Sequence, residues 1–411
     1  MLSMSAAALS LLSAQAVRER AHRLLALGLD GKLDHFSIDL ARLQDAADLV
    51  IGVTRRSYPD LDVPFHSRWR HFVVNGEDRW ERIACGQPWR DAYERARATF
   101  DLATVSVVLD AGAGPYWAYR DPASGARVGR SEGLALASLD MFAAGAFSSD
   151  PRRPLRVDAA ALQAMTRETL GRHFQVGVGN PLLGVEGRVA LLRRLGATVA
   201  ATPEVFANAD GPRPGGLFDH LIASAGDRSV AAPTVLSTVL RHLGQIWPSR
   251  LELDGFPLGD CWRHPALSCD DATSGLMPLH KLSQWLTYSL LEPLEWAGLA
   301  VTGIDGLTGL AEYRNGGLFI DTGVLALRDQ GEALVAHGLD TTLVVEWRAL
   351  TVALLDRLAA IVRARLGMSA EMLPLAKALQ AGTWAAGRQI ALRLRPDGAP
   401  PLAVVSDGTV F

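Results

Sequence analysis

Disulfide bonds, a surplus of one charge and long hydrophobic runs are all missing from this sequence. Three cysteines among 411 residues are too few for a disulfide framework, so a reducing compartment is expected. Lysine and arginine (41) nearly balance aspartate and glutamate (44), which leaves no cationic surplus to neutralise nucleic-acid phosphates. No apolar segment approaches the roughly 18 residues of a membrane span. These absences predict a cytoplasmic protein that binds neither nucleic acid nor membrane.

A metal-binding pattern is also weak. Cys261, His264, Cys269 and His280 are side chains that zinc prefers, but their irregular spacing lacks the short ligand pairs of a zinc site. Buried thiols and a loop histidine explain the group better than a metal site does. We therefore expect neither a metal nor a cofactor.

The residues that are present indicate a large folded core, because 49% of them are hydrophobic and 21% are charged. Helical spacing of apolar residues predicts helices over 5–27, 89–101, 130–147, 157–174, 185–200, 231–244, 278–298, 343–366 and 370–387. A β-branched run predicts a strand at 104–110, and a turn signal predicts a hairpin at 388–411. No linker separates these parts. The expected fold is one mainly α domain with a minor β part over residues 1–411.

The N-terminus has two interpretations. Residues 1–16 are apolar and end in small residues, as a signal peptide does, but they lack its positively charged start. Their helical spacing also continues into the residues that follow. A first amphipathic helix is therefore the preferred interpretation.

A glycine-rich turn follows Asp110 in the stretch VVLDAGAGPYW, residues 107–117. In nucleotide-binding proteins, such a turn brings the backbone close to the ligand. A methyltransferase would need alternating strands and helices after the turn, whereas helix follows helix here. The preferred interpretation is a turn that shapes the wall of a pocket, with Asp110 and Trp117 beside it.

The helix at 278–296 has two distinct stripes. One is apolar and contains Leu282, Leu286, Leu290 and Leu294. The other combines polar and aromatic side chains, namely Lys281, Gln284, Trp285, Tyr288 and Glu292. Buried polar groups need partners, so this second stripe favours a pocket wall over a solvated face.

Residues 307–325 contain the turn signal NGG, which predicts a hairpin. In an extended segment, Glu312 and Arg314 would point to the same side. The pair fits either catalysis with anion binding or a salt bridge that steadies the turn. Both interpretations stay open at this point.

Several longer motifs together resemble the uracil catabolism family of fungi and bacteria. They are GRSEGLALASLDMF, RPLRVDAAAL, GNPLLGVEGR, HKLSQWLTYSLLEPL, LTGLAEYRNGGLFIDTGVL and SDGTVF. The resemblance runs from about residue 15 to the C-terminus. It implies a role in a pathway that converts uracil to its ribonucleotide, opens the ring and later separates urea from the sugar.

A weaker resemblance points to the queuosine salvage family, which cleaves the N-glycosidic bond of a nucleoside 5′-phosphate. HKLSQWLTYSL and LTGLAEYRN are similar to two segments of that family, with Lys281, Gln284, Tyr313 and Arg314 matching. Glu312 stands where that family has aspartate. This resemblance implies a helical scaffold like that of DNA glycosylases.

The resulting hypothesis is an N-glycosidase that releases urea and ribose phosphate from a ring-opened uracil ribonucleotide. Cleavage through an oxocarbenium-like transition state needs a carboxylate, for which Glu312 is the first choice and Asp110 the second. The expected substrate-binding residues are Lys281, Gln284, Trp285, Tyr288, Tyr313, Arg314 and Trp117. The mechanism requires the helix of Lys281 to meet the segment of Glu312. The alternatives are a non-catalytic partner of the ring-opening, GTP-cyclohydrolase-like enzyme of the pathway and, less favoured, a SAM-dependent methyltransferase.

Overall fold

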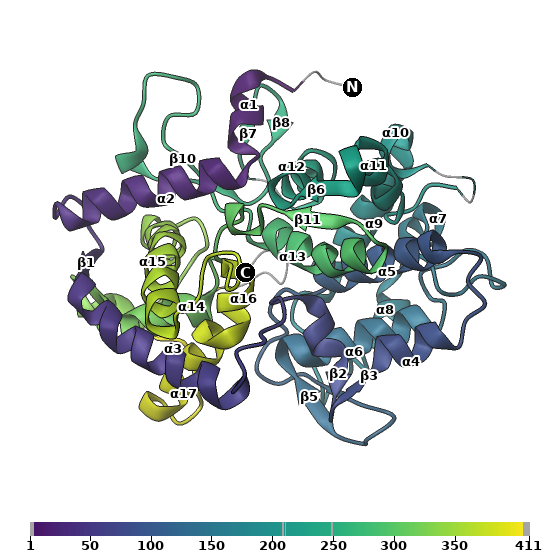
Figure 1. Ribbon diagram of the computed structural model, residues 1–411, viewed down its shortest axis with the longest axis horizontal. Helices are drawn as coiled ribbons and strands as arrows, with labels where there is room; N and C mark the ends of the chain where they lie inside the picture. The colour runs from purple at the N-terminus through teal and green to yellow at the C-terminus, as the bar shows by residue number, and fades with distance from the viewer. Residues whose placement is uncertain (1–3, 208, 210, 248–249, 406–411) are drawn as a thin grey trace. The chain divides into compact units, whose positions relative to one another are not determined.

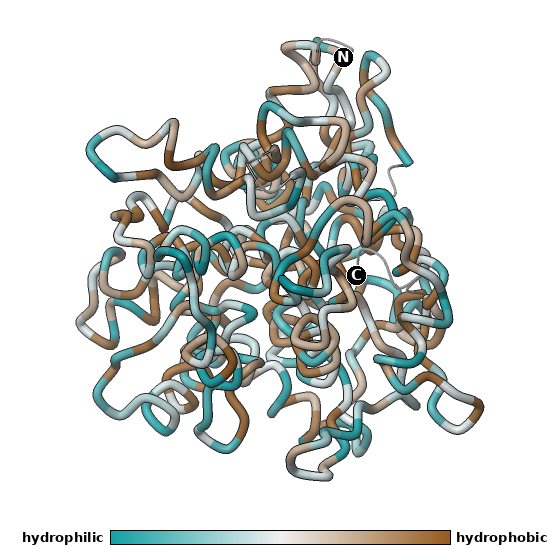
Figure 2. The backbone as a smooth tube through the Cα atoms, turned by 90° about the vertical axis from the view of Figure 1, so that its right-hand side faces the viewer, coloured by the Kyte–Doolittle hydropathy of each residue, from teal (hydrophilic) through white to brown (hydrophobic). Residues whose placement is uncertain are grey.

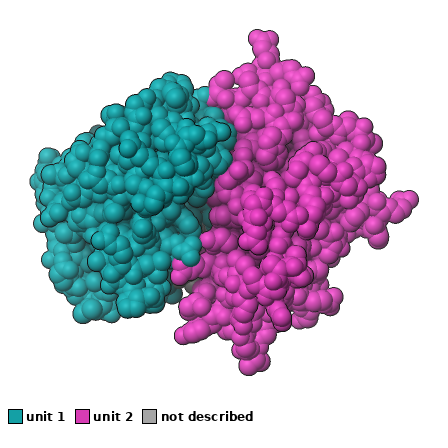
Figure 3. Space-filling model, turned by 60° about the horizontal axis from the view of Figure 1, so that its bottom comes forward, with its two compact units in different colours: residues 1–66, 249–284, 303–405 teal, residues 67–248, 285–302, 406–411 magenta. Residues whose placement is uncertain are grey.

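The computed structural model describes residues 4–207, 209, 211–247 and 250–405. Two compact units are built from interleaved parts of the chain (Figure 3). Unit 1 comprises residues 1–66, 249–284 and 303–405, and unit 2 comprises residues 67–248, 285–302 and 406–411. The chain passes from unit 1 to unit 2 inside helix α13 (Lys281–Trp296). The expectation of one domain over residues 1–411 stays a prediction.

Unit 1 holds its longest helix, α15, among several others (Figure 1). Its helices are α1 (Ala6–Leu11), α2 (Ala14–Leu29), η1 (Leu40–Arg42), α3 (Leu43–Ser57), η5 (Pro265–Leu267), η6 (Ile304–Gly306), α14 (Tyr313–Asp321), η7 (Gln330–Leu334), α15 (Thr342–Leu366), α16 (Leu375–Ala378), the π-helical η8 (Leu379–Thr383) and α17 (Trp384–Leu394). Its strands are β1 (Phe36–Ile38), β7 (Glu252–Leu253), β8 (Phe256–Pro257), β9 (Cys261–Arg263), β10 (Leu276–Pro278), β12 (Leu325–Leu327), β13 (Ala336–His337) and β14 (Ala403–Val404).

Unit 2 is also mainly helical (Figure 1). Its helices, besides most of α13, are η2 (Arg68–Phe72), α4 (Arg79–Cys85), α5 (Ala92–Val108), α6 (Arg130–Ala143), α7 (Ala159–Gln163), α8 (Arg167–His173), α9 (Val185–Ala201), α10 (Pro203–Phe206), α11 (Gly216–Ser224), η3 (Gly226–Arg228), α12 (Ala232–Leu243) and η4 (Gly244–Ile246). Its strands are β2 (Val73–Val74), β3 (Glu77–Asp78), β4 (Ala118–Arg120), β5 (Arg127–Gly129), β6 (Ser229–Ala231) and β11 (Ala300–Thr302).

The strands of both units are minor elements. Within the described part of the chain, each sheet contains two short strands. The pairs β1–β12, β9–β10, β7–β8, β2–β3 and β4–β5 are antiparallel, and β6–β11 and β13–β14 are parallel. The predicted fold class, mainly α with a minor β part, is therefore confirmed. The likeness to the scaffold of DNA glycosylases stays a prediction.

The helix predicted over 5–27 forms as two helices, because the chain leaves helical geometry at Leu12. The side chain of Ser13 then caps α2 by accepting from the backbone N–H of Ala16. On α1, Ala8 and Leu11 are buried together with Leu258, which lies next to the β7–β8 hairpin. The N-terminal apolar residues thus form part of the core of unit 1.

The strand predicted at 104–110 is wrong, because α5 continues through Val108. The side chain of Asp91 caps the start of α5, and almost every residue from Ala96 onward is buried. In a helix buried on all sides, packing outweighs the modest helix-disfavouring effect of β-branched residues. The glycine turn after Asp110 therefore follows a helix rather than the strand that a methyltransferase would supply.

The hairpin predicted at 388–411 is also wrong, because residues 384–394 form helix α17. This helix packs closely on α14, where a Cβ at Gly387 would lie 2.2 Å from the carbonyl oxygen of Arg314. The strand that follows, β14, pairs with β13. Residues 406–411, the last part of the predicted hairpin and the site of the SDGTVF motif, lie outside the described residues.

The remaining helices agree well with the sequence patterns. Helices α6, α9, α12, α13 and α15 form where they were predicted. The segment 157–174 divides into α7 and α8, and the helix predicted at 370–387 begins later, at α16. Hydrophilic and hydrophobic residues alternate at short intervals along the chain (Figure 2). Among the described residues, no helix combines the length and the apolar character that crossing a membrane requires.

Candidate functional site

A buried ion pair holds the start of α13 in unit 1. The carboxylate of Asp260 accepts from both terminal nitrogens of Arg348 at 2.9 and 2.8 Å, and both residues are buried. Asp260 Oδ2 also accepts from the backbone N–H of Lys281 at 2.9 Å. Burial opposes the charge of Asp260, but Arg348 and the hydrogen bonds outweigh this effect and lower its pKa. An ionised carboxylate therefore positions the first residue of α13.

The first turn of α13 meets the segment that contains Glu312. Gln284 Nε2 donates to Thr308 Oγ1 at 2.7 Å in buried surroundings. The charge of Lys281 is close enough to Glu312 to lower the pKa of its carboxyl group. Arg348 Nε also donates to the carbonyl oxygen of Ala311 at 3.4 Å. The contact that the mechanism requires is thus present within unit 1.

Glu312 is the N-cap of α14. Its two carboxylate oxygens accept from the backbone N–H groups of Asn315 at 2.5 Å and Arg314 at 2.7 Å. The residue as a whole is half-buried. Burial nevertheless raises the pKa of Glu312, and the two N–H groups and the charges of Lys281 and Arg314 only partly offset this effect. The structure thus contains a carboxyl group on a half-buried residue, with a pKa above that of an ordinary glutamate.

The hairpin predicted for residues 307–325 is wrong, because residues 313–321 form α14. The glycines of NGG instead allow close helix packing. A Cβ at Gly316 would lie 2.7 Å from the indole of Trp347 on α15. Glu312 and Arg314 are therefore a cap residue and a helix residue, not neighbours on one face of a strand.

Gln284 has one hydrogen-bonding atom without a partner. The residue is fully buried, and its Nε2 group is bonded to Thr308. Its Oε1 atom accepts no hydrogen bond from the described residues. A buried acceptor in this state costs roughly 1–3 kcal/mol, and a ligand N–H group would remove that cost. Gln284 is therefore a candidate ligand contact beside the Glu312 segment.

One guanidinium nitrogen of Arg314 makes a hydrogen bond within the fold of unit 1. Its Nη1 group donates to the carbonyl oxygen of Gly398 at 2.8 Å, and the residue is 4% exposed. Its guanidinium also lies 4.9 Å from the ring centroid of Tyr313. The hydrogen bond to Gly398 connects α14 to the C-terminal segment of unit 1. The expected substrate-binding roles of Arg314 and Tyr313 stay predictions.

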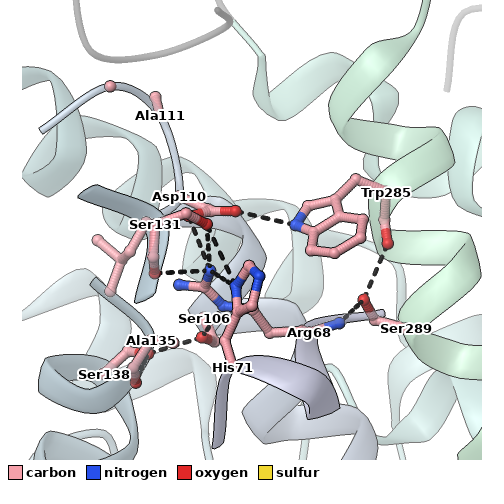
Figure 4. A network of polar contacts seen from close by, with 12 residues as sticks. Arg68, His71, Ser106, Asp110, Ala111, Ser131, Ala135, Ser138, Trp285 and Ser289 are labelled. Carbon is pink, nitrogen blue, oxygen red and sulfur yellow. Dashed lines mark hydrogen bonds and ion pairs between the residues drawn. The ribbon is translucent and has the colours of Figure 1, made fainter. Parts of the chain in front are cut away.

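Asp110 in unit 2 lies in a dense polar network (Figure 4). Its Oδ1 atom is 2.7 Å from Nη1 of the fully buried Arg68 and accepts from Ser131 Oγ at 2.6 Å. Its Oδ2 atom accepts from the indole of Trp285 at 2.9 Å. Arg68 and Ser131 also contact His71, with Nδ1 at 3.2 and 3.3 Å. Both oxygens of Asp110 are therefore occupied within unit 2.

A second buried arginine shapes the turn around Asp110. Arg188 of α9 donates to the carbonyl oxygens of Leu109, Ala111 and Gly112. Burial lowers the pKa of Arg188 to about 10, with the charge of Asp110 opposing the shift. The guanidinium remains charged at neutral pH and closes the glycine turn by binding its carbonyl groups.

The remaining aromatic candidates lie inside unit 2. Trp285 and Tyr288 are buried residues of α13, and Glu292 accepts from Arg70 at 2.6 Å and from Ser67 at 2.5 Å. The second stripe of α13 is thus not a solvated face. Trp117 donates from its indole to the carbonyl oxygen of Phe174 at 2.8 Å and stacks on that ring. The pocket-wall roles of these aromatic residues stay predictions.

The cysteines and histidines of the weak zinc pattern make contacts that do not involve a metal site. His264 Nε2 lies 3.4 Å from Glu346, and His280 Nε2 lies 3.0 Å from the carbonyl oxygen of Leu11. Cys261 is buried, and burial raises the pKa of its thiol to about 12. Among the described residues, no three His, Cys, Asp or Glu side chains gather as metal ligands would.

Sequence reasoning missed two residues that position the site in unit 1, Asp260 and Arg348. A signal for Arg348 was available, because it interrupts the apolar run LVVEWRALTVALL of α15 and is 1% exposed. A charged residue at a core position usually has an ionic partner. Nothing in the local sequence identifies Asp260 as that partner, since the two lie 88 residues apart.

The geometry defines a mainly helical protein in which a helix-capping glutamate lies on the same segment that binds a buried glutamine amide. The chain belongs to the family described as "Protein of unknown function (DUF1688)", whose model matches residues 10–411. It is similar to "Protein urg3" of Schizosaccharomyces pombe, with 42% identity over 411 residues and 98% of each chain. It is also similar to "Uracil catabolism protein 4" of Lachancea kluyveri, with 37% identity over 416 residues and 93% of each chain.

Proposed function

We propose that this protein acts in uracil catabolism and hydrolyses the N-glycosidic bond of a ring-opened uracil ribonucleotide. The products would be urea, or a urea derivative, and ribose phosphate. The pathway is supported by the name of the relative from Lachancea kluyveri. The reaction is supported by one observation above all, the unpartnered Oε1 of Gln284 beside the Glu312 segment.

Gln284 fits the leaving group of this reaction. A urea group presents several N–H donors, and Oε1 is a buried acceptor without a donor in the described structure. Thr308 orients the amide by accepting from Nε2. A substrate N–H would therefore meet an acceptor whose direction is already set, which reduces the entropy lost on binding.

Glu312 fits the acid–base step. Its raised pKa makes the ionised carboxylate a stronger base toward the proton of an attacking water. The water hydroxyl would bond to the anomeric carbon, the carbon–nitrogen bond would break, and the proton would pass through Glu312 to the departing nitrogen. The ionised form would also stabilise the positive charge that develops on the sugar.

Lys281 supplies positive charge near Glu312. Its charge lowers the pKa of Glu312, so the two groups interact. The backbone of Lys281 is held by Asp260, so the first residue of α13 has a defined position. We assign its ammonium to a phosphate oxygen or a ribose hydroxyl of the substrate, which it would bind as a point charge.

The test is incubation of the purified protein with ribosylurea 5′-phosphate, with UMP as the control substrate. Released urea and ribose phosphate are measured for the wild type, Glu312→Gln and the surface control Glu371→Gln. We expect release from ribosylurea 5′-phosphate alone, a drop of about 10²–10⁴-fold in kcat for Glu312→Gln, and no change for Glu371→Gln. Intact substrate with the wild type would contradict the proposal and favour a non-catalytic partner of the ring-opening enzyme.

A further inference from the structure

Unit 2 contains a pocket that the proposed reaction does not use. Its volume is about 130 Å³, several times the space that one water molecule occupies. Six of its lining residues determine its chemistry, namely Trp89, Glu94, Arg152, Arg153, Arg156 and Arg213. Four arginines and one glutamate thus contribute to the lining of the pocket.

Arg213 is held rigidly at the pocket by the buried Asp101. The carboxylate of Asp101 accepts from Nε of Arg213 at 2.9 Å and also from Nη2. The backbone N–H groups of Val157 and Gly215 donate to Asp101 at 2.9 and 2.6 Å. Because the ion pair uses Nε and Nη2, Nη1 of Arg213 is not committed to Asp101.

Arg156 is a second buried guanidinium in the same wall. It is 5% exposed, and its Nε atom lies 3.7 Å from Asp158. Asp158 also accepts from the backbone N–H and hydroxyl of Ser149. Burial lowers the pKa of Arg156, and the positive charge of Arg213 lowers it further. The charges of Asp158 and Asp101 act in the opposite direction. Burial of a guanidinium in the pocket wall favours an anionic ligand over a neutral one.

Groups at the pocket edge complement these two arginines. Arg152 and Arg153 are exposed and share Asp150, at 3.4 and 3.1 Å. The indole of Trp89 donates to the carbonyl oxygen of Ala84 at 2.8 Å, which orients the ring beside the pocket. Glu94 is engaged by Arg90, to whose backbone N–H it is bonded at 2.9 Å. The wall therefore combines oriented cations with one aromatic ring.

We propose that this pocket binds a phosphate monoester, with the phosphate on Arg156 and Arg213 and the carbon skeleton beside Trp89. Nη1 of Arg213 can donate to a phosphate oxygen while Nε and Nη2 stay on Asp101. Guanidinium groups bind a dianion more strongly than a neutral ligand. Arg152 and Arg153 attract the anion at the pocket edge. This site is separate from the Glu312 group of unit 1 and does not rest on the proposed reaction.

The test is calorimetric titration of the full chain with ribose 5-phosphate and inorganic phosphate, with ribose as the neutral control. We expect the two phosphates to bind, ribose not to bind, and Arg156→Met to weaken phosphate binding at least tenfold. The control Arg172→Met, an exposed arginine of the same unit, should bind like the wild type. Arg153→Met serves as a second variant in case loss of the buried Arg156 impairs folding, and it should weaken binding several-fold.

Three results would overturn the inference. The first is no phosphate binding by the folded wild type, and the second is unchanged binding in both Arg156→Met and Arg153→Met. The third is binding that is lost in Glu312→Gln but kept in Arg156→Met, which would place the phosphate in unit 1. Retained binding in Glu312→Gln is expected and keeps this test independent of the hydrolysis assay.

Discussion

Glu312 in unit 1 and Asp110 in unit 2 are both candidate catalytic carboxylates next to a helix end, but their partners differ. Asp110 is paired with the buried Arg68 and accepts from Ser131 and Trp285. Glu312 accepts two backbone N–H groups, and burial raises its pKa. A carboxylate whose charge is fully compensated serves best as a structural anion. A carboxylate with a raised pKa is better suited to accept and release a proton.

The substitution Asp110→Asn tests whether Asp110 is a structural anion, and it has the largest expected effect. Removing this charge leaves Arg68 buried without its ionic partner, so we expect a loss of about 3–5 kcal/mol in the free energy of unfolding. Glu312→Gln should lose at most about 2 kcal/mol, since it weakens only a helix cap. Denaturant unfolding measures both. The exposed pair member Glu186 provides the control, and Glu186→Gln should change stability by less than about 1 kcal/mol. Equal losses in the free energy of unfolding for Asp110→Asn and Glu312→Gln would contradict the different roles assigned to the two carboxylates.

A smaller effect is expected for Gln284→Met, which keeps the size of the side chain but removes the unpartnered acceptor. We expect KM for ribosylurea 5′-phosphate to rise about tenfold, which corresponds to roughly 1.4 kcal/mol. Stability should stay constant or increase, because the buried acceptor is no longer present. The exposed Gln389→Met is the matched control. If KM is unchanged while stability increases, the Oε1 atom has no ligand-binding role.

The smallest expected effect is a shift in the pH dependence of kcat/KM. Glu312 must be ionised to act as a base, so kcat/KM should rise with pH through the pKa of Glu312. Because this pKa is raised, the acid limb should lie above the range of an ordinary glutamate. Lys281 lowers the same pKa, so Lys281→Met should move the limb to still higher pH. The exposed Lys32→Met should leave it in place. A limb that moves to lower pH in Lys281→Met would contradict the assignment.

Much of the helical architecture followed from the sequence, whereas the local form of the site did not. The helix of Lys281 was predicted closely, because its leucine stripe repeats every four residues. The helix after Glu312 was predicted as a hairpin, because NGG is also a strong turn signal. Only the neighbouring helices show why glycine is needed there, since Gly316 packs against Trp347. The role of Glu312 as the N-cap of that helix was missed for the same reason.

Amphipathic helices, the balance of charge and the kinds of side chain available for chemistry were determined by the sequence alone. They depend on spacing within a few residues and on composition. The tertiary structure alone decided that Asp260 pairs with Arg348, that Gln284 meets Thr308 and that residues 104–108 continue a helix. The two side-chain contacts join distant parts of the chain, and the helix extension depends on burial on all sides. Local spacing specifies none of these, because long-range packing decides which side chains meet and which propensities are overridden.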